Sequence, residues 1–402
     1  MTETESVEPN PTESGGVDLM SPEAAAAPQD IYRRMHKQCP VAHSLSHGGH
    51  VITRYEDVLQ SFRDHKLFSS EMALHMGLGT ERPMIPQQID PPEQTRYRKI
   101  LDNQFSRKRM KVLEPIMREQ AAELLRTFAD QETVEFNKAF AVPFPCRVFL
   151  SLMGLPQEDL DLFLEFKDNI LRSQQIEPDA TKAYYLRAAT GKRIYAYFDK
   201  AFDRLSEAPE EDSILCYLLT VELDGKKLTR NELLDITFLF LLAGLDTVTA
   251  SIGCFVSFLA QNPNRRQELV DDPSLIPNAV EELLRWETPV MSVPRVTKRE
   301  CEISGVTIPE NTMVSLQCGA ANLDDEEFVD GDTVRWDRKF NRHLAFGGGV
   351  HRCLGSHLAR MELQIMLEEL LKHMPQFSLE PGKKPVYSPG IREVQVLPLK
   401  IG

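Results

Sequence analysis

The segment that decides the fold is FGGGVHRCLG, residues 346–355, and a helical pattern begins directly after it at Ser356. Its three consecutive glycines let the backbone turn tightly and bring N–H groups close to whatever Cys353 binds. A thiolate that accepts hydrogen bonds from the backbone and lies just before a helix N-terminus is kept ionised. The segment therefore predicts a cysteine that serves as a ligand.

Three other kinds of site fit this segment less well. A buried structural cysteine would not need a glycine-rich loop ahead of it. Zinc requires several Cys or His ligands, and His351 or His357 with a single Cys falls short of a tetrahedral set. A phosphate-binding loop would carry Gly-Lys-Ser/Thr, which this segment lacks.

The segment resembles the haem-binding loop of the bacterial-type soluble cytochrome P450 family, Phe-Gly-x-Gly-x-His/Arg-x-Cys-x-Gly, and every fixed position matches. The resemblance implies haem b as cofactor, dioxygen as co-substrate and Cys353 as the proximal iron ligand. Phe346, Gly347, His351 and Gly355 are then expected to contact the haem. Other matching motifs extend the resemblance over residues of about 30 to 402.

The rest of the chain predicts a mainly α protein. Apolar residues recur at i, i+3 and i+4 in Val112–Leu125, Glu158–Leu171, Ala183–Leu205, Leu233–Ala260, Pro277–Trp286 and Leu358–His373. Strands are expected at His50–Arg54, in a pair formed by Glu302–Ile308 and Thr312–Leu316, and in a hairpin around Val394–Leu399. With the resemblance, this predicts a single large triangular-prism cytochrome P450 fold with small peripheral β-sheets.

The sequence predicts a single domain preceded by a short N-terminal tail. Residues 1–28 are rich in Glu, Pro, Ser, Gly and Ala and lack the apolar stretch of a signal peptide, which predicts a disordered N-terminal tail. No linker or repeat divides residues 29–402, which we expect to form the haem-thiolate domain. The seven cysteines are scattered without a Cys-x-x-Cys pair, a pattern typical of the reducing cytoplasm.

One segment is long and apolar enough to cross a bilayer. Between Ile236 and Ala260 the only charge is Asp246. A capping box at 229–232, a stop at Asn262-Pro263 and the cost of a carboxylate in lipid favour a buried core helix. We therefore expect no membrane anchor, and the net charge of −14 argues against a nucleic-acid partner.

The apolar helix is interrupted at Ala243-Gly244-Leu245-Asp246-Thr247. A Gly and a Thr inside a buried helix can open a groove for dioxygen or water. Taken alone, the pattern is equally well explained by a Thr that bonds back to a carbonyl and an Asp at a polar interface. The resemblance implies the oxygen-activation pair: Thr247 hydrogen-bonds the bound oxygen, Asp246 relays protons from solvent, and Ala243 and Gly244 contact the haem.

Glu282 and Arg285 lie on one face of a predicted helix, where they can form a two-point ion pair. Glu-x-x-Arg alone is common on solvated helices. About seventy residues before Cys353, it resembles the structural Glu-x-x-Arg pair of the family, which stabilises the haem-loop side of the fold.

Four side chains resemble the groups that hold the haem propionates. Asp90-Pro91-Pro92-Glu93 leads into Gln94 and Arg98, and many family members have His where Gln94 stands. Arg295 and His351 match the other two donors. A buried anion needs partners of this kind.

Substrate contacts are predicted only by position. The candidate side chains are mostly apolar and several are Met, which suits an adaptable cavity, although any one of them could simply pack the core. They are Met72, Met76, Met84, Leu242, Val290, Met291, Val293, Ile391 and Arg392. Arg392 could pair with a carboxylate, so a fatty or terpenoid acid and a steroid or cyclic terpenoid both remain open.

The resemblance implies a monooxygenase that inserts one oxygen atom of dioxygen into an apolar small molecule. Electrons are expected from a ferredoxin and a ferredoxin reductase, because the chain has no flavin or nicotinamide fingerprint and no Cys cluster. The expected docking cations are Arg96, Arg98, Lys99, Arg107, Lys108, Arg109, Lys111, Arg352 and Arg360. We expect a monomer.

Two alternative functions fit the acid–alcohol pair less well. A haem-thiolate protein that senses or binds a ligand without turnover would not need the pair. A peroxide-using variant would more often replace the pair by an Arg-Pro arrangement.

Overall fold

A computed structural model describes residues 16–402 except 47, 72–76, 209–212 and 389–390. The helices are α2 (Pro22–Ala26), α3 (Pro28–Gln38), α4 (Tyr55–Arg63), α6 (Glu93–Leu101), α7 (Arg107–Met110), α8 (Glu114–Arg126), α9 (Pro143–Met153), α10 (Leu160–Leu171), α11 (Ser173–Ile176), α12 (Ala180–Glu207), α13 (Ile214–Thr220), α14 (Arg230–Gln261), α15 (Pro263–Asp271), α16 (Ile276–Glu287), α17 (Cys318–Ala321) and α18 (Ser356–His373). The strands are β1 (Val41–His43), β2 (His50–Ile52), β3 (Phe68–Ser69), β4 (Thr133–Glu135), β5 (Glu222–Leu223), β6 (Lys226–Lys227), β7 (Val293–Thr297), β8 (Cys301–Ile303), β9 (Val306–Ile308), β10 (Met313–Leu316), β11 (Phe377–Leu379), β12 (Val386–Ser388), β13 (Glu393–Val396) and β14 (Pro398–Ile401). The fold is therefore mainly α with small sheets, as predicted.

The helix α14 forms the centre of the core. Its capping box is complete, because the side chains of Thr229 and Glu232 each accept a hydrogen bond from the other residue's backbone N–H. The most apolar stretch of this helix is 78% buried inside the protein. It packs against α9, α12, α16, α18 and β13. The predicted core helix is confirmed, since its apolar surface faces other parts of the chain.

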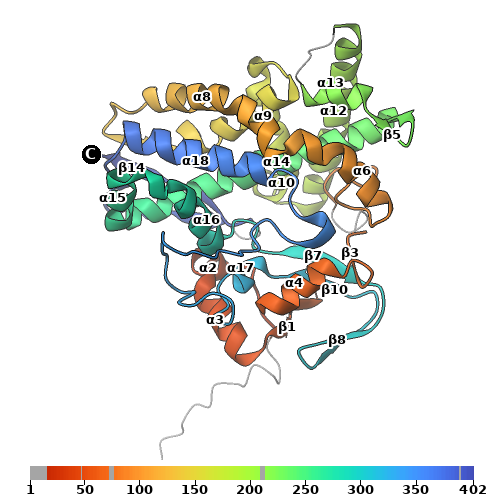
Figure 1. Ribbon diagram of the computed structural model, residues 1–402, viewed down its shortest axis with the longest axis horizontal. Helices are drawn as coiled ribbons and strands as arrows, with labels where there is room; N and C mark the ends of the chain where they lie inside the picture. Colours follow the sequence, from red (N-terminus) through yellow and green to blue (C-terminus); the bar gives the residue numbers. More distant parts are fainter. Residues whose placement is uncertain (1–15, 47, 72–76, 209–212, 389–390) are drawn as a thin grey trace, which may run out of the picture.

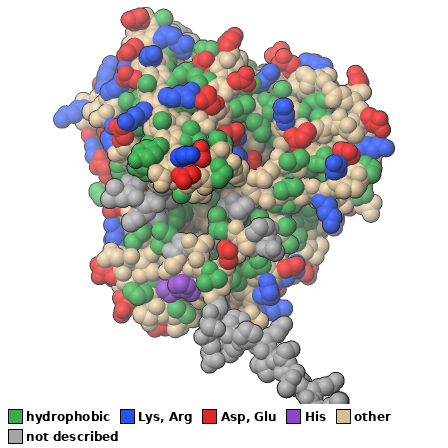
Figure 2. Space-filling view, turned by 180° about the vertical axis from the view of Figure 1, so that it is seen from behind, with side chains coloured by type: hydrophobic (Ala, Val, Ile, Leu, Met, Phe, Trp, Pro, Cys, Tyr) green, Lys and Arg blue, Asp and Glu red, His purple; other side chains and the backbone are tan. Residues whose placement is uncertain are grey.

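The molecule has a helical part and a part that carries the largest sheet (Figure 1). In the view of Figure 1, α8, α9 and α18 lie above, and the five-stranded sheet β1-β2-β10-β7-β3 lies below with α3 and α4. The glycine-rich segment enters α18 from a short 3-10 turn, Gly349–His351, which packs against α4. The segment thus joins the two parts. Seen from behind, the surface carries charges of both signs interspersed with apolar side chains (Figure 2).

The strand pair predicted from 302 to 316 forms differently. Residues 301–308 are a hairpin of their own, β8 with β9, which turns at Ser304 and Gly305. Both turn residues have positive φ, 46° and 80°, so this is a tight two-residue turn. The strand β10 pairs with β2 and β7 instead.

The predicted hairpin around Val394–Leu399 is also wrong. The strand β13 pairs with β12, while β14 pairs with β11 and β4. Leu397 lies between β13 and β14. Its backbone N–H donates to the Glu135 carboxylate, and its C=O accepts from the N–H of Phe136. The chain therefore passes from one small sheet into another at this point.

The predicted tail is too long. Residues 1–15 lie outside the described residues, but Ala24 and Ala25 of α2 are buried. Val17 also forms a β-bridge with Ser44. Alanine favours helix and packs closely, so the Ala-rich part of the segment joins the fold.

Candidate active site

The loop before α18 is closed by a hydrogen bond from the N–H of Cys353 to the C=O of Phe346, 2.9 Å long. Gly347 and Gly349 have positive φ, 64° and 63°. A β carbon at Gly349 would lie 2.0 Å from the carbonyl oxygen of Phe62 in α4. The glycines are therefore required by the left-handed turn and by the close approach of α4, which agrees with the predicted tight turn.

The Cys353 side chain is exposed, yet burial raises the pKa of its thiol. Protein thus surrounds the sulfur on most sides, while part of the residue remains accessible to a small molecule. A hydrogen bond from the backbone N–H of Gly355 and the charges of Arg98 and Arg352 favour the thiolate in return. This is the environment expected of a thiolate ligand, because a bound cation would complete its stabilisation.

A buried guanidinium lies near His351 of the cysteine loop, and the charge of Asp90 compensates it only from beyond ion-pair distance. The Arg295 guanidinium is buried, burial lowers its pKa to about 10, and among the described residues no carboxylate lies within ion-pair distance. Its hydrogen bond goes to the C=O of the adjacent Pro294. His351 Nε2 is buried without a partner among the described residues, and burial with the charges of Arg295 and Arg98 lowers its pKa to about 4. An anionic group such as a haem propionate fits these donors.

Gln94 is held differently from the prediction. Its amide nitrogen donates to the C=O of Val350 at 2.6 Å, and its amide oxygen accepts from Thr95. Arg98 likewise donates to the C=O of Arg352 at 2.8 Å and pairs with Asp102. Both side chains therefore link α6 to the cysteine loop through hydrogen bonds. Some of their N–H groups are already occupied by carbonyl oxygens of the protein.

On α14, Ala243 is exposed, whereas Gly244 packs against α9. A β carbon at Gly244 would lie 3.0 Å from the Phe149 ring of α9, so this glycine allows α9 to approach. The expected contact of Gly244 with the cofactor stays a prediction. Thr247 Oγ1 donates back to the C=O of Ala243 at 3.0 Å, one of the two arrangements that the sequence left open.

Asp246 is buried and ion-paired. Arg172, which follows α10, donates to its Oδ1 at 2.6 Å, and the ammonium of Lys167 lies 3.5 Å from the same atom. Arg172 also contacts Glu393 of β13 at 2.5 Å. No sequence pattern predicted that Arg172 and Lys167 contact Asp246, because both lie far from Asp246 along the chain.

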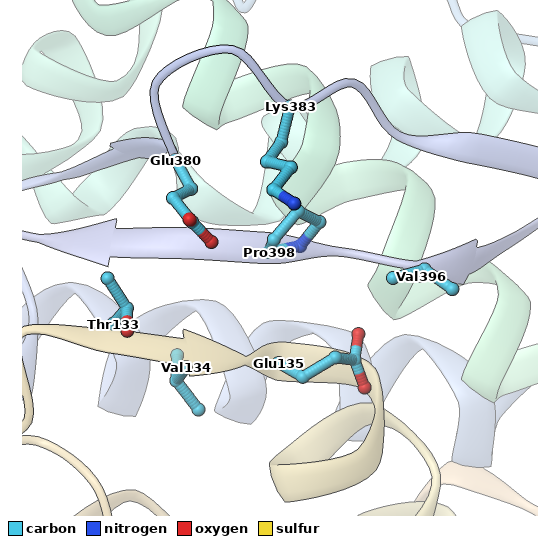
Figure 3. Close-up of a pocket in the computed structure, with 7 residues that line it drawn as sticks. All are labelled: Thr133, Val134, Glu135, Glu380, Lys383, Val396 and Pro398. Carbon is cyan, nitrogen blue, oxygen red and sulfur yellow. The ribbon is translucent and has the colours of Figure 1, made fainter.

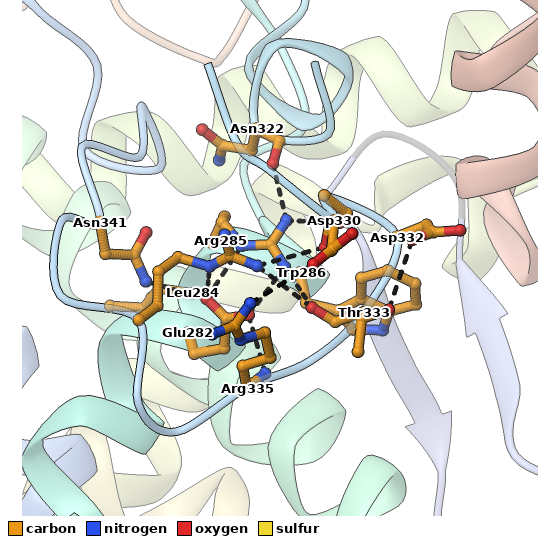
Figure 4. Close-up of polar contacts among 12 residues, drawn as sticks. Glu282, Leu284, Arg285, Trp286, Asn322, Asp330, Asp332, Thr333, Arg335 and Asn341 are labelled. Carbon is orange, nitrogen blue, oxygen red and sulfur yellow. Dashed lines mark hydrogen bonds and ion pairs between the residues drawn. The ribbon is translucent and has the colours of Figure 1, made fainter. Parts of the chain in front are cut away.

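Glu282 and Arg285 form a two-point ion pair, with N···O distances of 2.9 and 2.8 Å, and both side chains are fully buried. Figure 4 shows Arg285 directed also at the C=O groups of Asn322 and Thr333. Arg338 donates to Glu282 at 3.0 Å from the loop that leads to the cysteine segment. The pair therefore anchors that loop to α16, as the resemblance implied.

The predicted substrate contacts divide into three groups. Met72 and Met76 lie outside the described residues. An antiparallel β-bridge brings Val290 and Ile391 together. The side chains of Met84, Leu242 and Met291 are buried. Val293 is the first residue of β7. Arg392 contradicts its prediction: its Nε pairs with Glu287 at 2.9 Å and it also donates to the C=O of Ala25. Its charge is satisfied within the protein, so it is not available to a substrate carboxylate.

A surface groove of about 310 Å³ lies elsewhere, where the loop that carries Glu380 and Lys383 passes the paired strands β4 and β14 (Figure 3). Thr133, Glu135, Glu380 and Lys383 line it, and none of the predicted site residues does. It is therefore separate from the cysteine site.

The predicted docking cations are also divided. Arg96 pairs with Glu93 and Asp224, and Arg360 makes two contacts of 2.6 and 2.8 Å with Glu281 while its guanidinium lies over the Phe346 ring. Arg360 is thus engaged within the fold, whereas Arg96 forms exposed ion pairs at the surface, and the docking role of both stays a prediction. The cations that are exposed are Lys99, Arg107, Lys108, Lys111 and Arg352.

Comparison with known proteins agrees with this geometry. The family model for cytochrome P450 matches residues 28–397. The chain is 35% identical to a probable cytochrome P450 127A1 of Sinorhizobium fredii, over 84% of this chain and 80% of that protein. It is 33% identical to a vitamin D(3) 25-hydroxylase of Pseudonocardia autotrophica, over 91% of both chains.

Among solved structures, the chain is similar to CYP109E1 from Bacillus megaterium in complex with testosterone. The TM-score is 0.85 and the sequence identity is 28%, over 95% of this chain and 100% of that chain. The sheet order, the central helix α14 and the cysteine loop before α18 are thus parts of a known architecture. The chain belongs to the cytochrome P450 family of bacteria and is a haem-thiolate monooxygenase, an oxidoreductase that uses dioxygen.

Proposed function

We propose that this chain inserts one oxygen atom of dioxygen into a neutral, apolar small molecule at a haem held by the Cys353 thiolate. The observation that carries the proposal is an accessible Cys353 held by the glycine loop, together with the buried Arg295 guanidinium and the unpartnered Nε2 of the neutral His351 ring. Haem bound there would supply the electron-rich iron that cleaves the O–O bond.

The chain's own residues have three tasks in this proposal. Arg295 and Arg98 would neutralise the haem propionates, and the neutral His351 ring would donate a hydrogen bond to one of them. The N–H of Gly355 tunes the thiolate. Thr247, whose hydroxyl now bonds to the C=O of Ala243, turns to donate to the oxygen co-substrate, and Asp246 passes protons to it.

The pairing of Arg392 bears on the substrate class. Because Glu287 satisfies its charge, no cation is left at that position to hold a carboxylate. The named relatives act on vitamin D3 or bind testosterone, both large and apolar. We therefore favour a steroid or cyclic terpenoid over a fatty acid.

A spectral titration tests this proposal. The ferric protein is titrated with testosterone, vitamin D3 and palmitic acid, and the shift of the Soret band from low spin to high spin is recorded. The proposal predicts tight saturable shifts with the neutral ligands and weak ones with the acid. The reverse order would contradict it, and the Arg392→Leu variant checks whether that side chain contributes to recognition of the acid.

Electrons are proposed to come from a ferredoxin and its reductase in the cytoplasm, with this chain as a monomer. The exposed cations of α7 and the loops beside Cys353 support an acidic partner, since such contacts steer association. Lys108→Glu should slow the first electron transfer from a ferredoxin several-fold and weaken its salt dependence. Lys37→Glu, an exposed change in α3, should leave the rate unchanged. Equal rates for the wild type and Lys108→Glu would contradict the docking surface.

A further inference from the structure

Five charged side chains meet behind Thr247. Lys167 and Asp168 come from α10, Arg172 from the residue after it, Asp246 from α14 and Glu393 from β13. Four of the five are largely withdrawn from water: the side chains of Lys167, Asp246, Glu393 and Arg172 are 3%, 3%, 9% and 16% exposed. Asp168 is the outer member, at 43%.

Arg172 holds the cluster together. One of its terminal nitrogens contacts Asp246 Oδ1 at 2.6 Å and Glu393 Oε2 at 2.5 Å, and the other contacts Asp168 at 2.8 Å. Two carboxyl groups from different elements thus share a single nitrogen. Their oxygens are therefore close neighbours, although one belongs to the central helix and the other to a C-terminal strand.

The charges in this cluster do not balance. Three carboxylates face two cations, Arg172 and Lys167, and both cations are also shared with Asp168. A buried charge without compensation is costly, and a carboxyl group in that position keeps its proton instead. Asp246 contacts both cations, whereas Glu393 contacts only Arg172. Glu393 is thus the carboxyl group that ionises least readily.

We propose that Glu393 retains a proton at neutral pH and supplies it to Asp246, which delivers it beside Thr247. The inference rests on the proposed monooxygenase function. In the step, the O–H bond of the Glu393 carboxyl group breaks and an O–H bond forms on the Asp246 carboxylate, directly or through one water. Arg172 and Lys167 remain protonated, and solvent then reprotonates Glu393.

The electrostatics agree with this assignment. Burial and the charge of Asp246 raise the pKa of Glu393, and Arg172 and Lys167 oppose them only in part. Glu393 also lies near the predicted substrate site. Ile391, two residues before it, forms a β-bridge with Val290, and both of these residues are predicted substrate contacts. Glu393 is a positioning and proton-holding residue, since it acts on oxygen through Asp246.

Infrared difference spectroscopy of the resting haem-loaded protein in H₂O and D₂O tests the proton directly. The wild type should display the carbonyl stretch of a protonated carboxyl group at neutral pH. Glu393→Gln should lose one component of that band and Glu393→Asp should shift that component, whereas the component of the buried Glu362 carboxyl group, whose pKa burial also raises, should remain in both. The exposed Glu302→Gln is the matched control and should leave the band unchanged. A Glu393→Gln protein whose protonated-carboxyl band is identical to that of the wild type overturns the proposal.

Turnover tests the use of the proton. With NADPH, a plant-type ferredoxin, its reductase and testosterone as the probe, Glu393→Gln should release several-fold more peroxide per NADPH than the wild type. The peroxide fraction of the wild type should rise as pH increases and Glu393 ionises, whereas the variant should show no such dependence. Equal peroxide fractions in both proteins overturn the proposal. A wild type that oxidises nothing refutes the proposed function instead, and the infrared result, which needs no turnover, separates the two failures.

Discussion

Gly349 and Phe62 approach so closely that a β carbon on the glycine would be 2.0 Å from the Phe62 carbonyl oxygen. This contact joins the last turn of α4 to the loop that carries Cys353. The cation of Arg295 lies 5.6 Å from the centre of the Phe62 ring. One aromatic residue thus supports both the cysteine loop and a cation beside it.

Replacing Gly349 by alanine should therefore displace the loop. The new β carbon meets backbone, which cannot swing away, and the residue would also keep a φ of +63° that alanine rarely adopts. We expect a folded protein that retains much less haem, measured as the ratio of Soret to protein absorbance. Gly348→Ala is the control, since its β carbon would lie 3.2 Å from a Phe62 side-chain atom. Equal haem content in the two variants would contradict this account.

The buried pair predicts a large stability effect. Arg285→Ala leaves Glu282 buried with fewer cations and frees the carbonyls of Asn322 and Gly331. We expect a loss of about 3–5 kcal/mol in the free energy of unfolding by urea. Arg265→Ala removes an exposed pair with the same i, i+3 spacing and should cost less than about 1 kcal/mol. Similar costs for the two variants would show that burial does not govern the pair.

Acid should weaken the contact of Glu281 with α18. Burial opposes ionisation of Glu281, but hydrogen bonds from His343 and Arg360 outweigh it and lower the pKa to about 2 from 4.5. Because the folded-state pKa is the lower one, this stabilisation is complete above pH 4.5 and is lost as the pH falls toward 2. It is worth on the order of 2–3 kcal/mol. Urea unfolding of the wild type and Glu281→Gln should therefore converge as acid is added, and a constant gap would refute the assignment.

Thr247→Ala tests the oxygen-side role of the acid–alcohol pair. The variant loses the hydroxyl that bonds to Ala243 and leaves the helix otherwise unchanged. We expect NADPH consumption to continue while product falls by roughly 10²-fold and peroxide accumulates, because the proton no longer reaches the oxygen. Thr249→Ala is a matched control on the same helix, since its hydroxyl also bonds back to a carbonyl. Unchanged coupling in Thr247→Ala would remove that residue from the mechanism.

Local patterns predicted the parts of this fold that depend on neighbours along the chain. The periodicity of α8, α10, α12, α14, α16 and α18, the capping box and the glycine loop all express short-range geometry. The Glu282–Arg285 pair is one helical turn apart and could be foreseen for the same reason.

Contacts between distant segments could not be predicted in this way. Nothing near Gly349 indicates Phe62, and nothing near Asp246 indicates Arg172 or Glu393, because tertiary packing alone brings them together. The approach of Phe149 to Gly244 was likewise not predicted, because a glycine gives no sign in the sequence of the element that packs on it. The turn at Ser304-Gly305 could have been predicted from the glycine, but residues 302–308 were predicted to form a single strand.

The most direct test of the whole account is the spectrum of the reduced protein with carbon monoxide. Thiolate ligation by Cys353 predicts a Soret band at the long-wavelength position characteristic of haem-thiolate proteins, and Cys353→His should move it to the position of histidine-ligated haem. A freshly purified wild type whose carbon-monoxide complex already absorbs as a histidine-ligated haem, or that binds no haem at all, would contradict it.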